Sequence, residues 1–354
     1  MTNWITYVSD DEWKSKTASG LIANQDAARS AEKVGFKPLF YPRFNANLIK
    51  NEGWGERQAR IEAIISGVKP GDTVIVQYPT WINFMNFDMQ FFDALKKIEN
   101  VKTAALVWDI LSWVHDDSDR DYSGDPSLWM LNKFDVVIAA NPKMAHRLRE
   151  EGGVHRPILA MGITDIPYEG PLTDKTFEKR LYYVSTAINP SMIEDYTAKT
   201  PFYFIGPDWA VKEHPDHVHM LGQKMTDELP AIFEGGFGVV SYGRGGTYKG
   251  MLSYGEYNNP MKLSMYISSG LPPVVTSSSA HAGWVKDRGI GIVLDDLNEI
   301  DEVFDKMTET DYHEMLERLR PWQKAVSSGH FTQRACLEAV RIMRLGFTDS
   351  LSEI

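Results

Sequence analysis

Short apolar segments alternate with longer amphipathic segments along the whole chain. Strands of a parallel sheet are buried on both faces and are therefore apolar throughout, whereas the helices between them expose one polar face. The pattern thus predicts parallel strands joined by helices. In the first half the predicted strands are residues 4–8, 73–77, 103–108 and 135–139, and the predicted helices are residues 18–34, 56–66, 87–98 and 142–151.

Residues 165–179 interrupt this alternation with prolines, a glycine and several charges, so we expect a linker there. The alternation then resumes and ends in an amphipathic helix over 332–344, with Thr332 as its N-cap. The strands expected after the linker are 181–184, 201–205, 238–242, 273–276 and 291–294, and the helices are 226–234, 260–269, 280–289 and 302–324. The chain is therefore predicted to be an α/β protein with two Rossmann-like domains, 1–167 and 168–330, that face each other across a cleft. The last segment, 331–354, is expected to pack back on the first domain.

The composition and charge of the chain argue against several classes of protein. The 354 residues carry a formal charge of −11, and no basic run is present, which argues against nucleic acid as a partner. The single cysteine, Cys336, excludes an intramolecular disulfide and a cysteine-based metal cluster. We see neither a signal peptide nor an apolar run long enough to span a bilayer, so we expect a cytoplasmic protein.

The segment from Asn258 to Lys262 carries the strongest chemical signal. Pro260 suits the first turn of a helix, and Asn258 or Asn259 would cap it. Free N–H groups at a helix start and a lysine in the first turn together suit a diphosphate. The alternative is a capped surface helix with an ordinary exposed lysine.

Glycines around Gly236 precede the predicted strand that ends at Tyr242. They would allow a close approach of backbone to a ligand, although the C-cap of a helix that leads into the strand explains them equally well. The glycine fingerprint of dinucleotide-binding proteins is absent after the first strand, which disfavours an NAD-dependent oxidoreductase.

Asp109 follows the predicted strand 103–108, so its carboxylate is expected at the carboxyl edge of the sheet. There it would serve as a general base on an acceptor hydroxyl, unless it is a helix cap or a structural hydrogen-bonding group. Asp117 and Asp119 have a spacing seen in metal sites, but they lie in a highly charged loop, and we expect no metal. Thr80 and Trp81 follow another strand end and offer a hydroxyl and an indole, which suit a sugar.

These pieces together resemble the bacterial GT-B glycosyltransferases that extend the glycan of serine-rich-repeat adhesins, and the related exopolysaccharide β-1,6-galactofuranosyltransferases. The resemblance runs in order across nearly the whole chain. It rests on Thr17–Ala18 with Asn24, 71–81, Trp108–Asp109, 134–137, Lys143–Met144 with Leu148–Arg149, 235–238, Lys262–Leu263 with 270–272, and 329–332.

The resemblance implies a hexosyltransferase that uses a UDP-sugar as substrate, with no metal or other cofactor, and that forms homo-oligomers. Lys262 would contact the donor diphosphate, with Asn258, Asn259, Asn189, Gly236 and Tyr242 around the donor. Thr17, Thr80 and Trp81 would face a glycan or glycoprotein acceptor. Asp109, from its own position after a strand, is the candidate base of an inverting transfer.

The chain departs from the family at two places near the donor. Asn189–Pro190–Ser191–Met192 stands where such glucosyltransferases have an arginine, and Gly222–Gln223–Lys224 where they have a tyrosine, so the donor sugar stays open. Two further alternatives stay open: peripheral association with a membrane, and a non-catalytic GT-B subunit that binds a glycan or a partner transferase.

Overall fold

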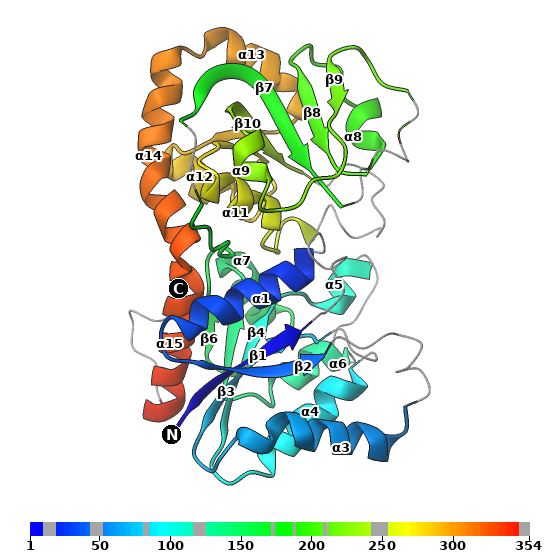
Figure 1. Cartoon of the computed structure of the whole chain (residues 1–354), viewed down its shortest axis with the longest axis vertical. Coiled ribbons are helices and arrows are strands. Elements are labelled where there is room, and N and C mark those ends of the chain that lie inside the picture. The colour runs from blue at the N-terminus through cyan, green and yellow to red at the C-terminus, as the bar shows by residue number, and fades with distance from the viewer. Residues whose placement is uncertain are drawn as a thin grey trace. The chain divides into compact units, whose positions relative to one another are not determined.

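The computed structural model describes residues 1–9, 19–42, 52–80, 85–115, 125–170, 174–186, 189–207, 211, 213–241 and 254–346. They form two compact units, each an α/β domain (Figure 1). The first unit is built from the chain between Met1 and Ile163 and includes the final segment from Gly329. The second is built from Thr164 to Ser328. The boundaries expected from the sequence, after residues 167 and 330, lie a few residues further along.

The first unit contains a six-stranded sheet with the order β2-β1-β3-β4-β5-β6, and every neighbouring pair is parallel. Its central strand β3 is buried along its whole length, as its apolar, β-branched sequence requires. The strands are β1 (Asn3–Ser9), β2 (Lys37–Pro42), β3 (Thr73–Tyr78), β4 (Lys102–Val107), β5 (Val136–Ala139) and β6 (Ile158–Ala160).

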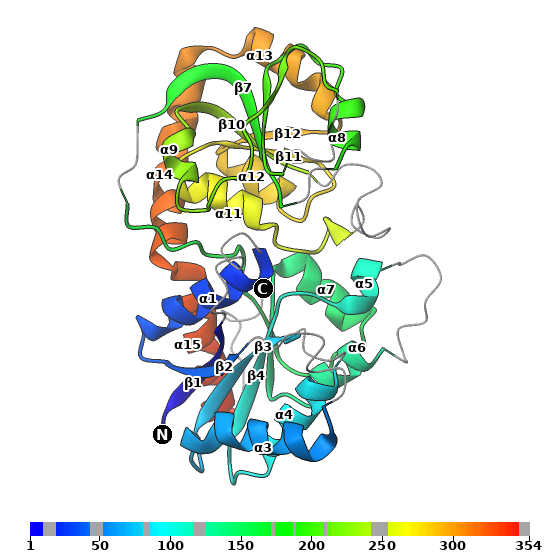
Figure 2. The same ribbon diagram turned by 45° about the vertical axis from the view of Figure 1, so that its right-hand side comes forward.

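Helices cover both faces of this sheet, with α1 and α15 on one face and α3, α4 and α6 on the other (Figure 2). The arrangement is that of a doubly wound domain. The helical segments are α1 (Ser19–Glu32), α3 (Trp54–Ile64), η2 (Ile65–Gly67), α4 (Asn86–Lys96), α5 (Leu111–His115), α6 (Pro126–Leu131), α7 (Pro142–Glu150) and α15 (His330–Leu345).

The second unit repeats the parallel design with the order β12-β11-β10-β7-β8-β9. Renumbered from its own first strand, this is the 3-2-1-4-5-6 order of a Rossmann fold. The strands are β7 (Thr176–Val184), β8 (Phe202–Ile205), β9 (Val218–Met220), β10 (Gly235–Val240), β11 (Pro273–Thr276) and β12 (Ile292–Leu294).

In this unit α8 and α13 share one core with the sheet, in which Ile193 and Phe304 pack with Phe202 and Val239. Helices α11 and α12 lie on the opposite face. The helical segments are α8 (Ser191–Glu194), α9 (Leu229–Ile232), α11 (Met261–Ser268), α12 (Ala282–Arg288), η4 (Leu297–Glu299), α13 (Ile300–Lys306) and α14 (Glu309–Ser328).

The strands that the sequence pattern missed are all at sheet edges. β2 contains Pro38 and Pro42 and exposes Phe40, features that an edge strand tolerates because one side of its backbone needs no partner. β6 and β9 have three residues each, too few to show a periodicity. The expected linker is also shorter than predicted, because β7 already begins at Thr176.

The predicted cap of the last helix is wrong. α15 begins at His330, and its N-cap is Gly329, whose φ of 84° lies in the left-handed region. A Cβ atom there would lie 2.4 Å from the Ser30 hydroxyl oxygen, so the position also needs glycine for space. Thr332 is instead a buried residue within the helix. Arg334 of the same helix donates to the carbonyl oxygens of Ala160 and Met161 and so ties α15 to the end of β6.

Candidate functional site

Each sheet has one switch point, at which the strand order reverses. It lies between β1 and β3 in the first unit and between β7 and β10 in the second. Open parallel sheets bind ligands at the carboxyl ends of the strands beside such a point, because the connecting loops separate there. The carboxyl edges of these strands are therefore the candidate site in each unit.

Tyr266 fixes the position of α11 against the switch point of the second unit. Its hydroxyl accepts a hydrogen bond from the Val184 backbone N–H at 3.0 Å and donates to the Tyr182 carbonyl at 3.2 Å. Its ring lies against Gly238, where an added Cβ atom would be 2.2 Å from Cγ of the tyrosine. The missing side chain at Gly238 thus lets the helix approach β7 and β10 closely.

Lys262 lies in the first turn of α11, as predicted. Its Nζ atom is 4.9 Å from the centre of the Tyr183 ring, near the carboxyl end of β7. The dipole of α11 adds positive potential at this end. A lysine, a helix N-terminus and a switch point therefore coincide.

The prediction that Asn258 or Asn259 caps α11 is wrong, since Pro260 occupies the N-cap position with an extended backbone. Asn258 is buried, and its backbone N–H donates to the Tyr254 carbonyl at 3.0 Å. Asn259 is half-buried, and its Oδ1 atom lies 2.9 Å from Nε2 of His281. Both asparagines are thus part of the loop that leads into the helix.

Two other predicted donor residues also belong to this unit. Asn189 follows β7, and its Oδ1 atom accepts from the Ser191 backbone N–H at 3.2 Å, which starts α8 close to the switch point. Tyr242 lies outside the described residues.

Gly236 lies at the opposite end of β10 from this edge. Its φ of 83° and a shift of the β10–β7 register mark a β-bulge, and a Cβ atom there would be 2.6 Å from the Arg180 carbonyl oxygen. Its own carbonyl accepts from the Tyr312 hydroxyl at 3.1 Å. The structure therefore gives this glycine a structural role, and we leave it out of the candidate site.

In the first unit Thr80 follows the carboxyl end of β3 and is held by Asp88 of α4. The Thr80 backbone N–H and hydroxyl each donate to one oxygen of the Asp88 carboxylate, both at 2.9 Å. Burial raises the pKa of Asp88 to about 6, and these hydrogen bonds act in the opposite direction. Thr17 and Trp81, the other predicted acceptor residues, lie outside the described part of the chain.

A buried network fixes the neighbouring strand ends. The Gln77 amide donates to the carbonyl oxygens of Thr6 and Asn24 and accepts at 2.9 Å from the indole N–H of Trp108. Asp109 follows Trp108, two residues beyond β4, and is half-buried. Asp109 therefore lies at the carboxyl edge of the sheet, as its position in the sequence predicted.

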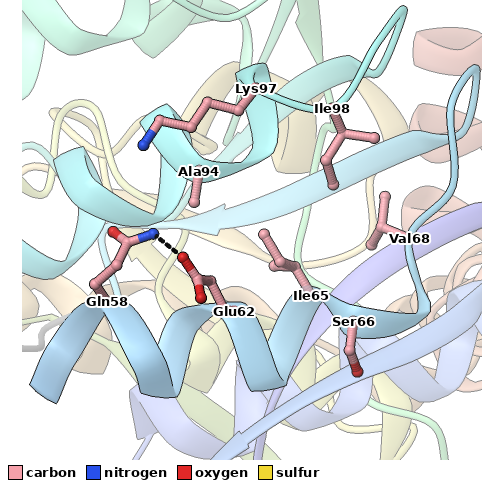
Figure 3. Close-up of a pocket in the computed structure, with 8 residues that line it drawn as sticks. All are labelled: Gln58, Glu62, Ile65, Ser66, Val68, Ala94, Lys97 and Ile98. Carbon is pink, nitrogen blue, oxygen red and sulfur yellow. Dashed lines mark hydrogen bonds between the residues drawn. The ribbon is translucent and has the colours of Figure 1, made fainter. Parts of the chain in front are cut away.

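A separate cavity of about 320 Å³ lies between α3 and α4 (Figure 3). Its lining includes Val68, shortly before β3, and Ile98, shortly before β4, so it opens at the amino ends of these strands. The Glu62 carboxylate accepts a hydrogen bond from Gln58 at its rim (Figure 3). This cavity therefore lies at the amino edge of the sheet, whereas Thr80 and Asp109 lie at the carboxyl edge.

Within the described ranges, no group of three or more His, Cys, Asp or Glu side chains is arranged to hold a metal ion. The Asp117 and Asp119 pair lies outside them. Among the same residues, no helix combines the length and the apolar character required to cross a bilayer.

The sequence reasoning missed Tyr266, Asp88 and His281. Tyr266 was hidden in an apolar helix, and its role depends on contacts with β7, more than eighty residues earlier in the chain. Asp88 in the first turn of a predicted helix looked like an ordinary dipole partner. His281 had no nearby partner in the sequence, since Asn259 is 22 residues away.

The chain matches known proteins in both units. Residues 2–163 match the N-terminal domain of the glucosyltransferase 3-like family, and residues 181–339 match its C-terminal domain. Glucosyltransferase 3 of Streptococcus gordonii is 27% identical over 325 residues, which cover 91% of this chain and 94% of that protein. The β-1,6-galactofuranosyltransferase WbbI of Escherichia coli is 22% identical over 289 residues, with 79% and 83% covered.

A solved structure shares the fold. It is described as trehalose-6-phosphate from E. coli bound with UDP-2-fluoro glucose, and it aligns with a TM-score of 0.59 at 9% identity over 96% of this chain and 99% of its own. The expected GT-B fold, with two Rossmann-like units and helices at the C-terminus, is thereby confirmed.

Proposed function

This chain belongs to the glucosyltransferase 3-like family of GT-B glycosyltransferases, and we propose that it transfers a hexosyl group from a UDP-sugar to a hydroxyl of a glycan or glycosylated protein. The observation that carries this proposal is the position of Lys262 in the first turn of α11, at the carboxyl end of β7 beside the switch point of the second unit.

The proposed donor is a nucleoside diphosphate sugar. The site offers positive charge, and a diphosphate needs such charge when its bond to the sugar breaks. Lys262 supplies a full charge and α11 supplies backbone N–H groups and its dipole, and both interact more strongly with the leaving diphosphate than with the intact donor. The related fold described with UDP-2-fluoro glucose supports uridine as the nucleoside. Asn259, Asn258 and Asn189 belong to the same edge and complete the proposed donor site.

The acceptor binds at the carboxyl edge of the first unit, where Thr80 and Asp109 follow neighbouring strands. Asp109 accepts the proton of the attacking hydroxyl, and that oxygen forms a bond to the anomeric carbon as the bond to UDP breaks. One displacement of this kind inverts the anomeric configuration. Lys262 stabilises the departing diphosphate, so the transfer proceeds without a metal.

The test is a screen of transfer and hydrolysis with UDP-glucose, UDP-galactose, UDP-N-acetylglucosamine and UDP-galactofuranose, with simple glycosides as acceptors. Transfer from one of these donors supports the proposal and names the sugar. Thermal unfolding with UDP separates an enzyme from a non-catalytic subunit, because a ligand at a hundred times its Kd stabilises the fold by about 2.7 kcal/mol. No stabilisation and no transfer would favour the non-catalytic subunit. Light scattering tests the homo-oligomer that the family resemblance implies.

A further inference from the structure

Polar contacts join the loop ahead of α11 to the loop ahead of α12. The Ala280 backbone N–H donates to the Gly255 carbonyl at 3.1 Å, and Nε2 of His281 lies 2.9 Å from Oδ1 of Asn259. These contacts link segments that the chain separates by more than twenty residues. Both contacts hold the loop that leads into the first turn of α11, where Lys262 lies.

His281 is placed for this contact rather than for its own helix. It occupies the N-cap position of α12, but its side chain makes no capping hydrogen bond there. The residue is only 3% exposed, and its ring reaches the amide of Asn259 instead. Because an amide group is planar, a hydrogen bond to Oδ1 sets the direction of both its oxygen and its nitrogen.

The opposite end of α11 is anchored independently. Tyr266 binds the backbone of β7 through its hydroxyl, so the body of the helix is fixed to the sheet. Lys262 lies between this anchor and Asn259. The first turn thus lies between a loop attached to His281 and a helix body attached to β7.

We propose that His281 is a positioning residue for the donor site: its hydrogen bond to Asn259 holds the loop before α11 so that Asn259 and Lys262 are preorganised for the diphosphate. This inference rests on the proposed function. In this role the His281 ring acts on the donor site through Asn259. Without the contact the sheet still folds, but the loop must become ordered when the donor binds. The free energy of donor binding is then less favourable by the cost of ordering the loop.

The test measures UDP binding by calorimetry together with the KM values for donor and acceptor. We expect His281→Ala to raise the Kd for UDP and the donor KM about tenfold, the loss that one buried hydrogen bond typically causes, and to leave the acceptor KM unchanged. His281→Gln should restore most of the affinity, because its Nε2 group donates from a similar position. His313→Ala, which removes an exposed histidine of α14, is the matched control and should change nothing.

A double-mutant cycle isolates the contact. Asn259→Ala should weaken UDP binding, and adding His281→Ala to it should cost little more, because the two side chains act as one unit. Additive losses, or a folded His281→Ala protein with unchanged UDP affinity, would overturn the inference. If His281→Ala does not fold, His281→Gln and Asn259→Ala still decide it, since a Gln variant no better than Asn259→Ala contradicts the hydrogen bond.

The wild-type protein separates this inference from the proposed function. Failure of the wild type to bind UDP would overturn both. UDP binding that is weakened by Lys262→Ala but not by His281→Ala would leave the proposed function standing and reject only the role of His281.

Discussion

The ammonium nitrogen of Lys262 lies 4.9 Å from the centre of the Tyr183 ring, so the first turn of α11 meets the carboxyl end of β7. A cation is attracted to the face of an aromatic ring, but the contact does not neutralise its charge. Tyr183 thus holds the lysine at the carboxyl edge of the sheet.

Lys262→Ala should lower transfer by about 10²-fold while the protein remains folded, because a charge that stabilises the leaving group acts mainly in the transition state. The measurement is kcat and kcat/KM with the preferred UDP-sugar, with circular dichroism as the check on folding. Lys286→Ala removes an exposed lysine of α12 and serves as the charge-matched control. Near wild-type turnover in folded Lys262→Ala would remove this lysine from the site.

Asp109→Asn should bind UDP normally and lose at least about 10²-fold in kcat, the lower end of what a general base supplies. The substitution keeps the size of the side chain and removes its basic oxygen. Asp93→Asn, an exposed carboxylate of α4, controls for the change in net charge. An equal loss of UDP affinity would indicate a structural role for Asp109, and unchanged turnover would place the base elsewhere or indicate retention of configuration.

Transfer should continue in excess EDTA, because Lys262 and α11 supply the positive charge that a divalent ion supplies in other transferases. The assay compares initial rates with EDTA alone and after addition of Mg²⁺ or Mn²⁺. Complete loss of activity that either ion restores would contradict the prediction and would direct attention to Asp117 and Asp119.

Gly238→Ala should destabilise the second unit by about 1–3 kcal/mol or more, because the new methyl group would overlap the Tyr266 ring and push α11 from the sheet. Urea unfolding gives the change in free energy. Gly283→Ala is the matched control: nothing lies within 4 Å of the added atom in α12. That substitution should stabilise the protein by about 0.5–1 kcal/mol, since alanine is the better helix former. Equal effects of the two substitutions would show that the Tyr266 ring does not fill the space beside Gly238.

Asp88→Asn should flatten the pH dependence of stability in mild acid. Burial raises the pKa of this carboxyl from 3.8 to about 6, so as the pH falls the folded state takes up the proton before the unfolded state does. The contribution of the group to the free energy of unfolding is therefore complete below the unfolded pKa and is lost as the pH rises through about 6.

Asparagine does not titrate and can still form a hydrogen bond with Thr80. The variant should therefore lose the part of the pH dependence of stability that Asp88 causes. Asp26 has a pKa raised to about 6 by its own burial and keeps part of the slope in the variant. Denaturant unfolding at several pH values between about 4 and 7 provides the comparison. A slope identical to that of the wild type would show that Asp88 does not titrate in this range.

The sequence alone determined the central strands, most helices, the division into two α/β domains and the positions of Lys262 and Asp109 at strand or helix ends. These features have local causes: a strand buried on both faces must be apolar, and a residue after a buried strand of a parallel sheet must lie at its carboxyl edge. The edge strand β2 was missed because an edge tolerates proline and an exposed side chain, and β6 and β9 were missed because three residues show no periodicity.

Only the tertiary structure decided how these ends are held in place. Asp88 binds Thr80, Gln77 joins Trp108 to the backbone of β1 and α1, Tyr266 binds β7, and His281 meets Asn259. The tertiary structure also places Gly236 in a bulge at the amino end of β10, away from the candidate site. Each of these relationships joins residues that the chain separates, and a hydrogen bond forms only when the donor and acceptor are within about 3 Å and well aligned. No local pattern encodes that distance, because the packing of the sheets and helices as a whole sets it.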